Sequence, residues 1–155
     1  MTSTASTEGK VEHLKQAIGW REWIELPALG GARIKAKVDT GARTSALHAC
    51  NIVEREVDGE QHVSFDLHPV QHDDNVVISC QVRVFEKRMV RNSGGEAEDR
   101  YVIVTPARLG DDTFDIELTL TQRDKMSFRM LLGRTAIRHR FLVNAGKSFL
   151  GGEPV

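Results

Sequence analysis

Apolar and polar residues alternate along most of the chain, which is the pattern of β-strands with one buried face. Alternation or a short apolar run marks the segments REWIELPAL (21–29), ARIKAKVD (32–39), HVSFDLH (62–68), NVVISCQVRVFE (75–86), RYVIVTP (100–106), TFDIELTLTQR (113–123) and RMLLG (129–133). Gly30 and Gly31 mark a turn between the first two segments. Many short strands separated by turn residues predict an all-β domain, either a closed barrel or a sandwich.

Two regions depart from this alternation. Small polar residues fill positions 1–10, and apolar residues then follow at helical spacing up to Ile18. We therefore divide the chain into residues 1–17, a flexible tail or short helix, and residues 18–155, one folded domain. A second helical pattern follows Gly133, with Ala136, Ile137 and Phe141 as its apolar side.

The segment EKRMVRNSGGEAEDR (86–100) predicts a long hairpin, because Asn92–Gly95 is a strong turn signal between two strands. Arg88 and Arg100 flank its tip. These two arginines either pair with acidic residues across the hairpin, as surface arginines commonly do, or face a ligand below it.

Composition places the chain among ordinary globular domains and gives no bias toward nucleic acid or anionic membrane. Its 155 residues suit one domain, 40% are hydrophobic and the formal net charge is -1. No apolar run approaches the ~18 residues of a membrane span, and the first residues contain no signal-peptide core. We therefore expect a cytoplasmic location, with Cys50 and Cys80 as reduced thiols.

Standard catalytic and metal-binding motifs are absent from the sequence. There is no H-E-x-x-H, no C-x-x-C and no G-x-S-x-G. The segment 146–148 resembles the end of a phosphate-binding loop, but Phe141 stands where that loop needs glycine, so we expect only a turn before a last strand. We expect no cofactor.

The histidines leave one alternative open. His48 and Cys50 flank Ala49 and could point to one side of a strand, while His68 lies near acidic residues in a segment containing Pro69. A structural zinc site could be built from such residues, but solvated loop histidines are the favoured interpretation, and we expect no metal.

The sequence KVDTGARTSAL, in which Asp39, Thr40 and Gly41 end an alternating strand, has a specific chemical use. An aspartic peptidase holds two carboxylates within ~3 Å so that they share one proton and activate a water between them. Gly41 would let backbone amides approach the carboxylate, and Thr40 could lock the loop. A surface Asp-Thr-Gly turn is the alternative, because three residues alone occur often by chance.

This segment resembles the active-site loop of the retropepsins, the single-domain aspartic proteases typified by retroviral enzymes. MLLGRTAI (130–137) resembles the strand and short helix that cross behind that loop, and the hairpin falls where the family has its flap. The match is closer to a bacterial family of small retropepsin-like proteins, commonly labelled ATP-dependent zinc proteases. It rests on KVDTGARTSALHA, RMVRNSGGEAEDRYVIVT, LTQRDKMSFRMLLGR and KSFL. The sequence contains neither a nucleotide-binding loop nor a zinc-protease motif, so the label misdescribes the chemistry.

The resemblance implies a closed β-barrel or sandwich with a flap hairpin and one short helix after the LLGR strand. It also implies that Asp39, Thr40 and Gly41 are catalytic. Members of the family often accompany ATP-grasp ligases that append glutamates to a ribosomal protein, which implies a peptidase acting on acidic, glutamate-rich tails. Retropepsins usually have an aspartate where Arg43 stands here, and this change suits an acidic substrate.

Only one Asp-Thr-Gly exists in the chain, so we expect a homodimer in which each chain supplies Asp39. Ala42, Arg43, Arg88 and Arg100 are expected to bind the substrate. Two alternatives stay open: a non-catalytic module that grips an acidic tail, and a zinc-dependent hydrolase, which follows the label alone.

Overall fold

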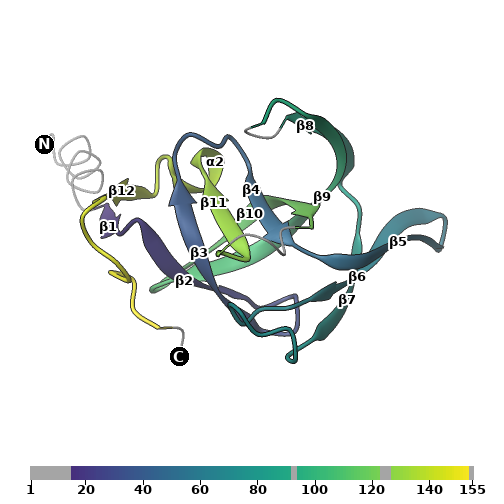
Figure 1. Ribbon diagram of the computed structural model, residues 1–155, viewed down its shortest axis with the longest axis horizontal. Coiled ribbons are helices and arrows are strands. Elements are labelled where there is room, and N and C mark those ends of the chain that lie inside the picture. Colours follow the sequence, from purple (N-terminus) through teal and green to yellow (C-terminus); the bar gives the residue numbers. More distant parts are fainter. Residues whose placement is uncertain (1–14, 92–93, 123–126, 154–155) are drawn as a thin grey trace, which may run out of the picture.

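The computed structural model describes residues 15–91, 94–122 and 127–153, and Figure 1 shows their arrangement. In this part of the chain the fold is nearly all β. The strands are β1 (Gln16–Ile18), β2 (Arg21–Leu26), β3 (Ala32–Asp39), β4 (Ser45–His48), β5 (Cys50–Val57), β6 (Glu60–Leu67), β7 (Ile78–Arg83), β8 (Glu86–Arg91), β9 (Ala97–Leu109), β10 (Asp112–Thr121), β11 (Met130–Gly133) and β12 (Phe141–Val143). Among these residues the single helix is α2 (Arg134–Ile137).

Six strands close into a barrel. The main sheet has the order β10-β4-β11-β3-β2-β9-β8, and β10 also pairs with β9, which joins the two ends of the first six strands. The thirteen-residue β9 can serve this purpose because it is long enough to pair with β8, β10 and β2 along its length. Closure gives each of these six strands a neighbour on both sides, and it confirms the all-β closed fold expected from the alternation.

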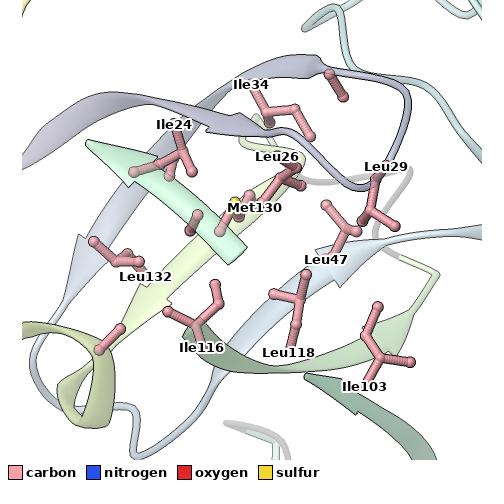
Figure 2. Packing of buried hydrophobic residues seen from close by; sticks show 14 of the residues in the cluster. Ile24, Leu26, Leu29, Ile34, Leu47, Ile103, Ile116, Leu118, Met130 and Leu132 are labelled. Carbon is pink, nitrogen blue, oxygen red and sulfur yellow. The ribbon is translucent and has the colours of Figure 1, made fainter. Parts of the chain in front are cut away.

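Alternate residues of these strands fill the barrel with aliphatic side chains. Ile24, Leu26 and Ile34 from β2 and β3 lie toward Leu47 and Leu132 from β4 and β11, as Figure 2 shows, and each is at most 1% exposed. The inward-facing positions are two residues apart within each strand, which is why the period of two in the sequence predicts the core. The core holds the strand ends that carry the candidate site.

A second sheet, β5-β6-β7, extends from one side of the barrel (Figure 1). Its strand β5 was not predicted, because CNIVEREV has mostly exposed positions and a register shift between Cys50 and Val53. The predicted hairpin is confirmed: β8 and β9 pair from Glu86↔Val102 to Arg91↔Ala97. Part of the predicted tip, residues 92–93, lies outside the described residues.

The predictions at the two ends of the chain were partly wrong. Residues 1–14 lie outside the described residues, and residues 16–18 form β1, which pairs in parallel with β12. Helix α2 ends at Ile137, so the buried Phe141 belongs to β12 and not to a helical face. The last strand expected after Gly146 is not present among the described residues. The segment up to residue 153 is held instead by hydrogen bonds, such as that from the Phe149 amide to the Arg21 carbonyl at 3.0 Å. Within the described ranges, no helix is long and apolar enough to cross a membrane.

Candidate active site

Asp39 is the last residue of β3, and the chain turns immediately after it. The Ala42 amide donates to the Asp39 carbonyl at 3.2 Å, and the Gly41 amide donates to Asp39 Oδ1 at 3.0 Å. A Cβ on Gly41 would lie 3.3 Å from that same oxygen, so a side chain here would crowd the carboxylate. The turn therefore holds a half-buried carboxylate beside an exposed Thr40 and Gly41.

The strand β11 and helix α2 cross directly against this loop. β11 runs parallel to β3, with Gly133 opposite Asp39. The Arg134 amide donates to the Ala42 carbonyl at 2.7 Å, and the Thr135 amide donates to the Arg43 carbonyl at 3.0 Å. Two backbone hydrogen bonds thus fix the residues that follow the Asp-Thr-Gly turn.

The crossing is too close for any residue but glycine. A Cβ on Gly133 would lie 2.5 Å from the Thr44 carbonyl carbon, a distance that real contacts do not reach. The Gly133 amide donates to the buried Ser45 hydroxyl at 3.0 Å. In turn, the Thr119 hydroxyl donates to the Ser45 carbonyl at 3.1 Å, so β10 also secures the loop. The sequence analysis did not predict that Ser45 holds this crossing, although the hydroxyl residues after Asp39 were a signal for it.

Arg134 supports the loop with its side chain. Its Nη1 donates to the Thr40 carbonyl at 3.0 Å, so the guanidinium of the crossing segment binds the backbone of the Asp-Thr-Gly turn. In retropepsins the resemblance implies that this arginine pairs with the aspartate that Arg43 replaces. Here it contacts a backbone carbonyl, and Arg43 is exposed with no ion pair in the described part of the chain.

The hairpin places Arg88 against the same loop. Its Nη1 donates to Thr44 Oγ1 at 3.4 Å, its Nη2 to Glu117 at 2.8 Å and its Nε to Glu86 at 3.1 Å. These hydrogen bonds to Glu86 and Glu117 raise the pKa of the Arg88 guanidinium above its usual value. Arg88 therefore couples the hairpin to the Asp39 loop while its charge is largely balanced by carboxylates.

Arg100 lies opposite Arg88 in the hairpin register. Its side chain is only 10% exposed, and its Nε lies 3.4 Å from Glu98 Oε1. Arg100 thus pairs with an acidic residue of its own strand, and Arg88 pairs with Glu86 on β8 and Glu117 on β10, so these ion pairs do not run across the hairpin as expected. The structure brings Arg88 to the Asp39 loop and leaves Arg100 largely buried on β9.

The histidines depart from the favoured interpretation. His48 is 1% exposed and therefore is not a solvated loop residue. Its Nε2 lies 3.4 Å from Cys50 Sγ, and His68 Nδ1 lies 3.7 Å from the same sulfur. This cluster is separate from the residues that hold the Asp39 turn.

A six-stranded barrel with an Asp-Thr-Gly loop pinned by a glycine crossing defines the retropepsin-like class of aspartic peptidase folds. The chain belongs to the RimB-like family, whose model, described as the retropepsin-like aspartic endopeptidase RimB, matches residues 17–154. This family assignment confirms the resemblance drawn from the sequence motifs.

Relatives extend the comparison to longer proteins. The chain is 48% identical over 139 residues to a Shewanella pealeana protein named "Probable alpha-L-glutamate ligase", and 51% identical over 139 residues to a Parasynechococcus marenigrum protein of the same name. Each match covers 90% of this chain but only 30% of the relative. The crystal structure of a Legionella pneumophila protein of unknown function (DUF785) superposes with a TM-score of 0.73 at 27% identity, covering 88% of this chain and 98% of that one.

Proposed function

We propose that the protein is an aspartic peptidase in which Asp39 from each of two chains forms the catalytic dyad. The observation that carries the proposal is the Asp39 turn itself: a carboxylate at a strand end, oriented by the Gly41 amide and fixed from behind by the Gly133 crossing. The family assignment supports the same chemistry.

The reaction needs no group beyond the two carboxylates and a water. One Asp39 is ionised and accepts a proton from the water, whose oxygen attacks the peptide carbonyl carbon. The other Asp39 is protonated and gives its proton to the carbonyl oxygen, forming a neutral gem-diol. The diol then collapses as its C–N bond breaks, a diol proton returns to one carboxylate, and the amine leaves with a proton from the other. Thr40 and Gly41 hold the carboxylate in place through the loop backbone.

A dimer follows from the count of carboxylates. Each chain has a single Asp-Thr-Gly, and a two-fold axis brings the same loop of both chains face to face. Two ionised carboxylates at ~3 Å repel, so the pair retains one proton. We propose that the protein works in the cytoplasm without a catalytic metal.

The proposed substrate is an acidic peptide tail, rich in glutamate. Arg43 is exposed beside the loop and offers a planar fork of donors that suits a carboxylate. Ala42 leaves room next to it. For Arg88 and Arg100 to add positive charge at the hairpin, the substrate has to displace the carboxylates that pair with them. The relatives named as glutamate ligases support a link to an ATP-grasp enzyme that makes such tails.

A second candidate function is capture of a glutamate tail without cleavage. The observation that favours it is that this chain matches only 30% of the length of a relative whose name, a glutamate ligase, describes making a bond to glutamate and not breaking one. In such a protein a retropepsin-like domain could hold the growing tail with the same arginines.

The test uses the purified protein with two peptides of equal length, one with an oligoglutamate tail and one with an oligoglutamine tail, followed by mass spectrometry. Cleavage that is lost in Asp39→Asn and kept in Asp58→Asn supports the peptidase. Asp58 is a suitable control because it is an exposed turn residue with φ 53°, a conformation that asparagine tolerates.

Other outcomes separate the alternatives. Tight binding of the glutamate peptide by wild type and Asp39→Asn alike, with no product, supports the capture function and overturns the peptidase. Cleavage that survives in Asp39→Asn but stops when a chelator is added to protein that stays folded supports a zinc hydrolase.

A further inference from the structure

His48, Cys50 and His68 are brought together by strand register. Cys50 lies opposite Asp66 in the antiparallel pair β5–β6. His48 precedes Cys50 by two residues, and His68 follows Asp66 by two residues. If the antiparallel register continues, the two histidines lie opposite each other. Residues two apart in a strand point to the same face, so both histidines lie on the face that carries Cys50. The imidazole rings lie accordingly at 5.8 Å between centroids, with an interplanar angle of 33°.

We propose that His48 Nε2, Cys50 Sγ and His68 Nδ1 form a zinc site, separate from the proposed peptidase chemistry. One imidazole nitrogen of each histidine and the thiolate are ligands that zinc prefers. The distances from the Cys50 sulfur to the two nitrogens are 3.4 and 3.7 Å. Zinc with its usual bond lengths in a tetrahedron separates sulfur and nitrogen by about 3.6 Å. All three ligand atoms lie within 4.8 Å of one another.

The donors sit on backbone that is held in place before any ion binds. The His48 amide donates to the Arg129 carbonyl at 2.7 Å, and the Ala49 amide donates to the Thr121 carbonyl at 3.0 Å. Asn51 adopts φ 53° within the register shift that begins at Cys50. Such a bulge re-aims side chains, and here it follows the cysteine that the two histidines face.

Acidic groups next to the cluster suit a dication. Asp74 accepts a hydrogen bond from the Arg129 guanidinium at 2.7 Å and interacts electrostatically with His48 and His68. Asp66 accepts hydrogen bonds from Asn51 and Ser79, both at 2.8 Å, and interacts electrostatically with His68. The charges of a zinc ion and Arg129 are therefore balanced by the Cys50 thiolate and the two carboxylates.

The site would join two parts of the fold. His48 is the last residue of β4 in the barrel. Cys50 is the first residue of β5 in the second sheet, and His68 directly follows β6 of that sheet. Zinc would cross-link these sheets at their junction, with water in the fourth position. Binding releases the thiol proton, since Cys50 coordinates as the thiolate.

The first experiment measures zinc binding to the full chain after removal of metal by a chelator. Wild type is expected to bind one zinc per chain in competition with a chromogenic chelator. Cys50→Ser and His68→Ala should each weaken binding more than roughly 100-fold, because even residues that only orient ligands change affinity by up to that factor. Cys80→Ser and His62→Ala are the matched controls and should bind as wild type does.

Three further readouts keep the proposal falsifiable if a ligand variant folds poorly. Cobalt in wild-type protein should give a thiolate-to-metal charge-transfer band, and zinc at ~100-fold above its Kd should raise the wild-type Tm by roughly 5–10 °C. Zinc should also protect Cys50 from alkylation. Cys80 serves as an internal reference, because burial, aided by the Asp66 carboxylate, raises its pKa to about 11 and keeps it a poorly reactive thiol.

Zinc bound by wild type at less than one equivalent, equal binding by Cys50→Ser, or cobalt that shows no thiolate band would overturn the site. None of these outcomes depends on peptide cleavage, so the result stands apart from the test of Asp39.

Discussion

Two carboxylates on neighbouring strands have opposite surroundings. Glu22 on β2 is fully buried and accepts hydrogen bonds from three backbone amides, those of Gly19 at 2.6 Å, Leu150 at 2.9 Å and Gly151 at 3.0 Å. Asp39 on β3 is half-buried and, within the described residues, accepts one, from Gly41.

The difference separates a structural acid from a candidate catalytic one. Both oxygens of Glu22 are used to hold the chain on either side of β2, including the segment near residue 150, so no water or substrate can reach them. At Asp39 the fold orients one oxygen and leaves the other without a bond among the described residues. A general base needs such a free oxygen within reach of its water.

The sharpest test of this contrast is Asp39→Asn. Because each chain supplies Asp39, this substitution replaces both carboxylates of the dyad and should lower the rate of peptide cleavage by at least roughly 10³-fold, since proton transfer by the dyad is lost. The Tm should stay equal or rise, because the repulsion between the two carboxylates disappears. Cleavage assays and thermal unfolding of the same preparation measure both. Wild-type turnover in Asp39→Asn would remove Asp39 from the mechanism.

At Glu22 we expect a loss of stability, in contrast to the unchanged or raised Tm of Asp39→Asn. Glu22→Ala leaves three buried amides without their acceptor and should lower the free energy of unfolding by about 3 kcal/mol. Urea unfolding measures this loss. Glu25→Ala on the same strand is the control. Within the described part of the chain, Glu25 makes only long ion pairs of 3.8 and 3.9 Å with Arg33 and Arg108, so its loss should cost less than about 1 kcal/mol. An equal loss in both variants would mean that the three amides contribute nothing specific.

Much of the fold could be predicted because inward and outward residues alternate. The segments that became β2, β3, β6 and β9 bury every second residue along most of their length, whereas β10 alternates only up to Leu118 and buries its last four residues in a row. β5 was not predicted because both of its faces are largely exposed. β1 and β12 were not predicted because strands of three residues are too short to show a period. Their pairing is a long-range contact, which local pattern does not encode.

The candidate site was predictable only where its chemistry is contiguous in sequence. Asp39, Thr40 and Gly41 form one motif, and Gly133 belongs to a second that resembles its crossing partner. The partners of Arg88 lie on β8 and β10, and the approach of His68 to Cys50 depends on the β5–β6 register. Neither the register nor the closing pair β9–β10 can be read from residue types alone.

A third test asks whether Asp39 lies in a cleft for acidic peptides. Arg43→Ala should reduce the preference for oligoglutamate over oligoglutamine tails about tenfold, the value of one charge-assisted hydrogen bond. The Tm should not change, because Arg43 is exposed and makes no ion pair in the described part of the chain. The wild-type preference should also weaken as salt rises. An unchanged preference in Arg43→Ala would exclude a substrate role for this residue.

The smallest effect is expected at Arg88, which links the hairpin to the Asp39 loop. Arg88→Ala removes the contacts with Glu86, Glu117 and Thr44 and should lower the free energy of unfolding by about 1 kcal/mol, since the side chain is 29% exposed and solvent screens its ion pairs. With the hairpin less firmly held over the loop, KM should rise for both peptides. Arg83→Ala, which breaks the exposed pair with Glu60 at 3.0 Å on the second sheet, is the matched control and should leave KM unchanged. A loss confined to the oligoglutamate peptide, with no change in stability, would instead show that Arg88 leaves its carboxylates to bind substrate directly. That result would make the hairpin, and not only the Asp39 loop, the source of charge selectivity.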